Sequence, residues 1–235
     1  THFDLLFGQH LGNIIKLYSH DVSVYAGDDW EITEKLKVNY GLRFGYFQQF
    51  GPFTRYTKDV FGKASDTIVY KRGEKVVDYN GLEPRLSMRY AFTKSFSVKA
   101  SYTHNYQYIH LATMSSVSLP TDVWMPSTEK IKPQISDQYA MGVFKNFKDN
   151  NFETSIEVYY KTMQNQVDYK EGAQPSDNVY DNPDNEFTFG KGWAYGAEFF
   201  VKKRSGKLTG WIGYTLSWTW RQFNDINYGL QYLAK

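Results

Sequence analysis

Hydrophobic and polar residues alternate with a period of two along much of this chain, which is the pattern of β-strands with two different faces. The clearest run lies between residues 36 and 47. Its apolar face carries Leu36, Val38, Tyr40, Leu42, Phe44 and Tyr46, and its other face carries Lys37, Asn39, Gly41, Arg43 and Gly45. The apolar positions do not recur at three and four residues, so an α-helical interpretation fails.

Seven further segments alternate in the same way. The regular ones are Leu82 to Phe92, Phe96 to Thr103, Phe152 to Lys161, Trp193 to Lys202 and Leu208 to Thr219, and the less regular ones are Val22 to Ile32 and Gln138 to Lys145. A ninth strand is expected near Phe3 to Ile14. These lengths are close to the roughly 9–11 residues that a tilted strand needs to cross a bilayer. Pro84 lies inside one segment, where its missing N–H should weaken the ladder or mark a bulge.

Short and long connections alternate between these segments. The connections at 33–34, 93–95, 148–150 and 204–207 are short, whereas those spanning 48–81, 105–135 and 164–190 are long. An outer-membrane barrel has short turns at its periplasmic end and longer loops at its outer end. A soluble β-sandwich has no reason to keep its long loops at one end, so the pattern predicts an all-β, antiparallel transmembrane barrel segment.

The composition fits a membrane barrel better than a membrane helix. Aromatic residues make up 18% of the chain, yet mean hydropathy is −0.57 and no run approaches the roughly 18 apolar residues of a membrane helix. The rings gather near both ends of the segments, as in the two interfacial belts of a barrel. They are Tyr46, Tyr102, Tyr106, Trp193, Tyr195 and Trp218 near the long loops, and Tyr90, Phe92, Phe96 and Phe152 near the short turns.

The alternative is a soluble barrel or sandwich that buries these rings. The charges on the opposite face suit a wet or plugged lumen, but they would also suit the exterior of a soluble barrel. They are Arg85, Arg89, Glu153, Glu157, Glu198 and Lys202. A net charge of +2 gives no sign of a nucleic-acid partner, and the lack of cysteine excludes thiol-redox, zinc-finger and disulfide-scaffold classes.

Several long blocks resemble TonB-dependent outer-membrane receptors of the Bacteroidetes type. They are Tyr25 to Phe44 (YAGDDWEITEKLKVNYGLRF), Gly81 to Tyr90 (GLEPRLSMRY), Ser97 to Leu111, Leu119 to Lys145, Phe152 to Tyr169 and Gly192 to Asn227. The resemblance implies a barrel of about 22 strands around an N-terminal plug. Residues 1–235 would then supply only eight or nine of those strands, with the plug domain absent.

The resemblance also implies a function and partners. Such receptors lie in the bacterial outer membrane and import a scarce substrate with energy from the TonB complex, which they contact through the plug. Outer-membrane lipid, an unidentified substrate and a surface lipoprotein or other envelope protein are the expected partners. No cofactor is expected. A small outer-membrane barrel, acting as an adhesin or as a subunit of an envelope assembly, is the alternative, and an outer-membrane enzyme is a more distant one.

Ligand contacts are expected in the long loops. Tyr106, Tyr108, His110, Trp124 and Met125 bring rings and a thioether into one connection, although the same residues could simply pack that loop. The acidic stretch from Ser176 to Glu186 offers oxygen ligands, but it does not match an EF-hand loop, so a solvated loop is expected instead of a metal site. His104 and His110 have no neighbouring carboxylate in the sequence, and no catalytic residues are expected.

Overall fold

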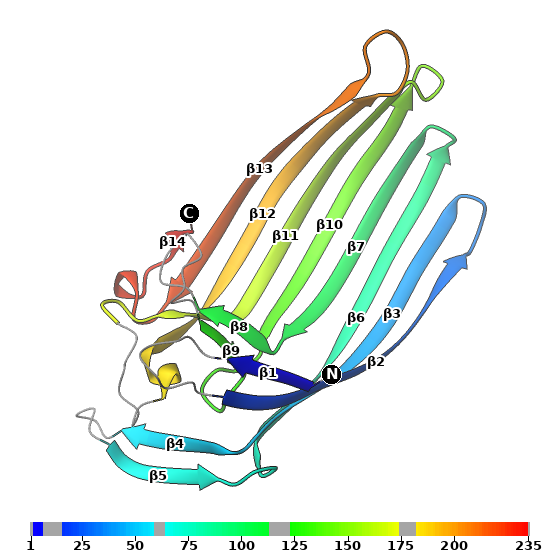
Figure 1. Cartoon of the computed structure of the whole chain (residues 1–235). Coiled ribbons are helices and arrows are strands. Elements are labelled where there is room, and N and C mark those ends of the chain that lie inside the picture. Colours follow the sequence, from blue (N-terminus) through cyan, green and yellow to red (C-terminus); the bar gives the residue numbers. More distant parts are fainter. Residues whose placement is uncertain (1, 7–15, 59–63, 113–122, 174–181, 235) are drawn as a thin grey trace.

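One antiparallel sheet dominates the computed structural model, which describes residues 2–6, 16–58, 64–112, 123–173 and 182–234. Its ten strands follow the order β1-β2-β3-β6-β7-β10-β11-β12-β13-β14 (Figure 1). The eight long strands are β2 (Lys16–Glu31), β3 (Leu36–Phe50), β6 (Lys75–Thr93), β7 (Phe96–Gln107), β10 (Gln134–Phe147), β11 (Phe152–Tyr169), β12 (Phe187–Lys203) and β13 (Gly210–Phe223). The short strands at the two edges are β1 (His2–Leu6) and β14 (Tyr232–Leu233).

The eight predicted strands are all confirmed, but several of their predicted ends are wrong. Most strands continue further toward the long loops, and β11 reaches Tyr169 where the alternation predicted an end at Lys161. At the short-turn end, Leu208 and Thr209 were expected in a strand but precede β13, because the connection after β12 continues through Thr209. The ninth strand begins as β1, whereas residues 7–14 of its predicted span lie outside the described residues. None of the helices in the described part of the chain is long and apolar enough to span a membrane.

The apolar side chains form rows that cross most of the long strands of the sheet. Strand register pairs Tyr102 with Tyr139, Tyr139 with Tyr160, Tyr160 with Tyr195 and Tyr195 with Trp218, so five rings lie side by side at one level. The next row toward the short turns consists of Val38, Met88, Ala100, Met141, Val158, Ala197 and Leu216. Most of these large side chains are exposed, as expected for a face that contacts lipid.

The opposite face of the sheet, here called the polar face, carries the charges. One of its rows runs Glu31, Lys37, Arg89, Lys99, Gly142, Glu157 and Glu198 across seven strands. Three cations are therefore adjacent, with acidic residues on either side of them. The two predicted faces of the sheet are confirmed by this arrangement.

The two ends of the sheet differ. The short turns all lie at one end, and the smaller elements gather at the other, the long-loop end (Figure 1). Those elements are the hairpin of β4 (Phe53–Lys58) and β5 (Ala64–Tyr70), the hairpin of β8 (Ile109–Ala112) and β9 (Val123–Pro126), and two 3-10 turns, η1 (Pro183–Glu186) and η2 (Asn227–Gly229). The long loops thus contain strands of their own.

Pro84 marks the point where β7 leaves its neighbour. The ladder between β6 and β3 continues through Pro84, which pairs with Leu42, whereas the ladder between β6 and β7 ends next to it at Arg85 and Thr103. A proline cannot donate to a ladder, which agrees with the predicted weakening. Beyond Thr103, β7 remains paired with β10 but no longer with β6, so the end of β7 can pack against the polar face.

Candidate functional site

The long loops form a folded assembly with its own apolar core. Leu17, Ala112, Met125, Ile131 and Phe187 are buried together, and they come from β2, β8, β9, the segment after β9 and the start of β12. Part of the rim of this core is formed by Phe53, Val167, Tyr169 and Phe189. Because these residues come from all three long connections, the loops are held in one arrangement, here called the loop assembly.

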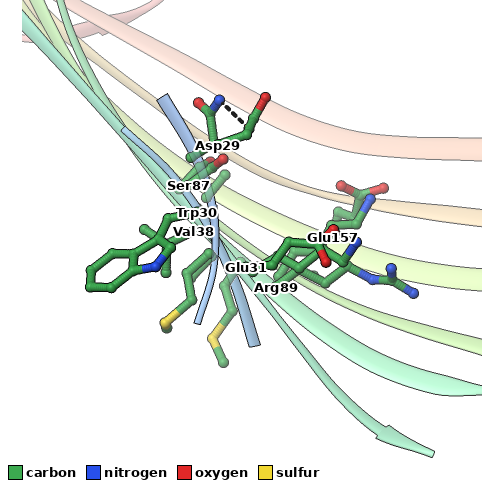
Figure 2. A pocket seen from close by; sticks show the side chains of 16 residues that line it. Asp29, Trp30, Glu31, Val38, Ser87, Arg89 and Glu157 are labelled. Atoms are coloured by element: carbon green, nitrogen blue, oxygen red, sulfur yellow. Dashed lines mark hydrogen bonds and ion pairs between the residues drawn. The ribbon is translucent and has the colours of Figure 1, made fainter. Parts of the chain in front are cut away.

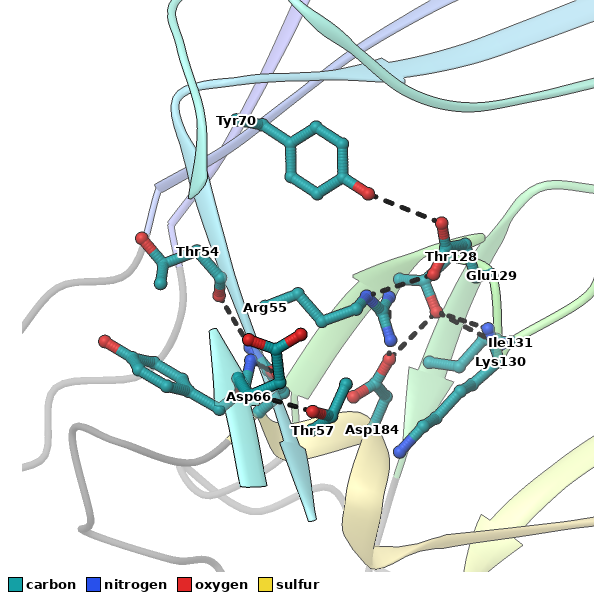
Figure 3. A network of polar contacts seen from close by, with 12 residues as sticks. Thr54, Arg55, Thr57, Asp66, Tyr70, Thr128, Glu129, Lys130, Ile131 and Asp184 are labelled. Atoms are coloured by element: carbon teal, nitrogen blue, oxygen red, sulfur yellow. Dashed lines mark hydrogen bonds and ion pairs between the residues drawn. The ribbon is translucent and has the colours of Figure 1, made fainter. Parts of the chain in front are cut away.

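A buried ion pair joins the three loops (Figure 3). The Arg55 guanidinium on β4 lies 3.4 Å from Asp184 Oδ2 in η1, and both residues are buried, at 4% and 2% exposure. Thr128, which follows β9, donates its hydroxyl to the same Asp184 oxygen at 3.0 Å. Arg55 Nε also lies 3.3 Å from Glu129 Oε2, close enough for charge attraction but without hydrogen-bonding geometry. Arg55 and Thr128, from the first two long loops, therefore both contact Asp184 in the third.

Hydrogen bonds extend this network. The Tyr56 backbone N–H donates to Asn182 Oδ1 at 2.7 Å, and Asn182 Nδ2 donates back to the Thr54 carbonyl at 3.0 Å, as in a strand pair. Tyr70 donates its hydroxyl to Glu129 at 3.5 Å, and burial together with that carboxylate raises the pKa of Tyr70. The predicted acidic loop is thus partly structural: Asn182 and Asp184 hold the loop assembly together, while residues 176–181 lie outside the described residues.

Two of the predicted ligand residues, Tyr106 and Tyr108, lie on the polar face beyond the end of the β6–β7 ladder. The Tyr108 ring stacks on Phe47 of β3 at 5.2 Å, and the Tyr106 ring stacks on Tyr108 at 6.2 Å. Gly81 makes room for them, because a Cβ there would lie 2.5 Å from the Tyr106 ring. Burial and the Glu83 carboxylate raise the pKa of Tyr108 to about 12.

The other three predicted residues belong to the β8–β9 hairpin. His110 and Met125 are paired across it and buried, at 1% and 2% exposure, so they pack the loop assembly and do not present a surface. His110 Nε2 lies 3.0 Å from Ser127 Oγ, and burial lowers the pKa of His110 to about 4. Trp124 is 49% exposed on the opposite face of the hairpin, where it pairs with Leu111. Of the five, Tyr106 and Trp124 are the most accessible.

Tyr106 and Tyr108 line a pocket of about 560 Å³, here called the outer pocket. Its remaining lining residues come from β2, β3, β7, β8, β10 and β11, and they are mainly polar: Asp21, Arg43, Asn105, Gln107, Ile109, Gln134, Ile135, Ser136, Lys161, Met163 and Gln166. Arg43 is held by Glu83, whose carboxylate is fully buried and lies 3.2 Å from the Arg43 guanidinium. This volume falls within the roughly 300–1,000 Å³ of small-molecule sites.

A second pocket of about 560 Å³ lies nearer the short turns. Figure 2 shows Trp30 and Val38 directed to one side of the strands, and Arg89 and Glu157 to the other. Most of its lining residues belong to the polar face, including the adjacent cations Lys37, Arg89 and Lys99. Like charges directly opposite each other destabilise a sheet, so this row favours contact with an oppositely charged surface.

Sequence reasoning missed the residues that join the loops and most of those that line the outer pocket. Asp184 was part of a stretch that was expected to be a solvated loop, and Arg55 was not singled out; only the fold brings the two residues together. The fold also supplies a carboxylate for His104, because Asp137 lies across the strand pair at 2.7 Å from His104 Nδ1. Among the described residues, no group of three or more histidine, cysteine, aspartate or glutamate side chains could hold a metal ion.

Comparison with known proteins supports the membrane interpretation. The family described as "TonB dependent receptor-like, beta-barrel" matches residues 8–234. No curated protein matches the sequence significantly. Among solved structures, the FrpB iron transporter from Neisseria meningitidis (F3-3 variant) aligns with a TM-score of 0.59 at 17% identity, covering 92% of this chain and 28% of that one.

Two further receptors share the fold. The ferripyoverdine receptor of Pseudomonas aeruginosa, solved with ferripyoverdine bound, gives a TM-score of 0.56 at 15% identity, over 94% of this chain and 25% of that one. The ferric yersiniabactin uptake receptor FyuA from Yersinia pestis gives 0.51 at 15% identity, over 89% and 28%. The chain thus spans between 25% and 28% of the length of these receptors. It belongs to the TonB-dependent receptor β-barrel family and lies in the outer membrane.

Proposed function

We propose that this chain forms part of the barrel wall of a receptor that binds a scarce substrate at the cell surface and imports it by TonB-coupled transport. The observation that supports this most directly is the sheet itself. Its apolar face continues over all eight long strands, while its polar face has a pocket beside the folded long loops. In an outer-membrane barrel the long loops lie outside the cell, so this pocket would face incoming substrate.

The row of charges on the polar face fits a second part of the proposal. The adjacent cations Lys37, Arg89 and Lys99, with Glu157 and Glu198 beside them, would contact a plug domain of complementary charge. The TonB complex would act through that plug. A Bacteroidetes-type origin and a surface lipoprotein as partner remain predictions from the sequence resemblance.

Uptake measurements test the transport function. Cells expressing the parent receptor should accumulate its substrate, and deletion of either the receptor gene or the gene for TonB should abolish this accumulation. The three solved receptors are named for iron, ferripyoverdine and ferric yersiniabactin, so ferric siderophores are a reasonable first set of compounds. Uptake that continues without TonB would contradict the proposal, and an adhesion defect without any uptake defect would favour the small-barrel alternative.

A further inference from the structure

Two charged residues that line the outer pocket lack a charged or hydrogen-bonding partner among the described residues. Asp21 projects from β2 and Lys161 from β11, and both are half-buried. Among the described residues, neither makes a hydrogen bond or an ion pair, whereas Arg43 nearby is held by Glu83. Removing charge from water without a partner is unfavourable, so the pocket favours a ligand that supplies both opposite charges.

The two ends of the outer pocket, one at Asp21 and the other at Lys161, favour ligand groups of opposite charge. Near Asp21, the Tyr108 hydroxyl is influenced by the carboxylates of Glu83 and Asp21 more strongly than by Arg43, and burial and these carboxylates together raise the pKa of Tyr108. That side of the pocket therefore favours a cationic group. Lys161 lies on the other side, and no carboxylate is among the lining residues of β10 and β11. That side favours an anionic group.

The separation indicates an elongated ligand. β2 and β11 are five strand spacings apart in the sheet, which is about 24 Å measured along its surface. Curvature of the sheet and the length of the two side chains shorten this gap. Five extended residues span about 17 Å, so a single amino acid is too short to meet both charges, whereas a short peptide is long enough.

The residues between the two charges suit a peptide backbone. Asn105, Gln107, Gln134 and Gln166 line the pocket, and an amide side chain can both donate and accept hydrogen bonds. Gln134 and Gln166 already bond to each other at 3.1 Å, which orients the pair. The Tyr106 ring and Met163 add apolar surface for side chains. A purely anionic ligand would be repelled by Asp21, and a purely cationic one by Lys161.

Building on the transport function proposed above, we infer that the outer pocket binds a short peptide with free ends, its amino group toward Asp21 and its carboxylate toward Lys161. The peptide lies along the amide side chains of β7, β10 and β11. Arg43, fixed by Glu83, lies beside the pocket as a further donor for a ligand carbonyl or carboxylate.

Retention of peptide pools by the purified, immobilised full-length receptor tests this inference. Three random-sequence pentapeptide pools are compared by mass spectrometry: free-ended, N-acetylated and C-amidated. Asp21→Asn should lower retention of the free-ended and C-amidated pools by about tenfold or more, but leave the N-acetylated pool unchanged, because blocking the amine has already removed the contact. Lys161→Gln should do the same for the free-ended and N-acetylated pools while leaving the C-amidated pool unchanged.

Matched controls are Asp149→Asn and Lys202→Gln, which change the same residue types at the short-turn end, away from the outer pocket. Neither should alter retention of any pool. Equal retention of the three pools, or no retention at all, would overturn the inference. If the receptor then still imported another substrate in a TonB-dependent manner, the transport function would stand without it. Retention that depends on both peptide ends in a receptor without TonB-dependent uptake would preserve the pocket assignment and contradict the transport function.

Discussion

The barrel wall and the loop assembly are stabilised in opposite ways. In the wall, large apolar side chains such as Met141 and Val158 point outward and are exposed, while the strands are joined by their backbone ladders. In the loop assembly, apolar residues are buried and a charged pair, Arg55 and Asp184, lies in the interior. The wall depends on lipid for its apolar face, whereas the loop assembly resembles a small water-soluble domain. Substitutions should therefore have different effects in the two regions.

The largest effect is expected for Asp184→Ala in the loop assembly. Removing one partner of a buried ion pair typically costs about 3–5 kcal/mol, and Arg55 would keep only the half-exposed Glu129 carboxylate as a partner. The loops should become sensitive to limited proteolysis, while the folded fraction of the barrel, measured by its heat-modifiable migration in gels, should stay the same. Proteolysis at the wild-type rate would show that the network does not hold the loops. The double variant Arg55→Met with Asp184→Leu should recover part of the protection.

In the wall, the substitution with the largest expected loss of stability is Met141→Arg. An arginine on the lipid face costs up to about 2–4 kcal/mol, depending on its depth, which should appear as a lower unfolding free energy in urea titrations in lipid vesicles. Ala140→Arg is the matched control, since Ala140 is the neighbouring residue at nearly the same depth on the polar face. Equal losses for the two variants would contradict the assignment of the faces.

Acid should weaken the loop assembly and leave the wall unaffected at moderate pH. The pKa of His110 is about 4 in the folded protein and about 6.5 when unfolded. Between these values only the unfolded state binds the proton, so stability is fully present above pH 6.5 and falls by about 1.4 kcal/mol per pH unit as the pH drops toward 4. Loop proteolysis measured from pH 7.5 to 4.5 should accelerate accordingly, and His110→Asn should remove most of this dependence. A wild-type profile in that variant would assign the dependence to another group.

The smallest effect is expected at an exposed ion pair next to a short turn. Lys37 and Glu31 form such a pair, and surface pairs contribute about 0–1 kcal/mol. Lys37→Gln should therefore change the unfolding free energy in vesicles by less than about 1 kcal/mol, in contrast to the buried pair of the loop assembly. A loss as large as that for Asp184→Ala would mean that Lys37 has a further role in the wall.

The alternation of residues was sufficient to predict the wall, because a strand with one face in lipid repeats every two residues. It could not place the ends of the strands beyond the membrane. There β11 continues as part of the loop assembly, and its two faces no longer differ in whether they contact lipid or water. The candidate site was predicted only in part. Tyr106 and Tyr108 line the outer pocket, but Asp21, Arg43 and Lys161 reach it from three distant strands, and residue spacing carries no information about such contacts.

The row of five rings from Tyr102 to Trp218 has a consequence for how the sheet responds to membranes of different thickness. Tyrosine and tryptophan carry polar tips that prefer head-group depth, so the row holds the outer side of the sheet at a fixed level. The rings near the opposite turns are mixed: Phe92, Phe96, Phe147 and Phe152 have no such tips, whereas Trp30, Tyr90 and Trp211 do. Because the five-ring row anchors the outer side of the sheet, the outer pocket should keep its height above the outer head groups when the bilayer becomes thinner or thicker.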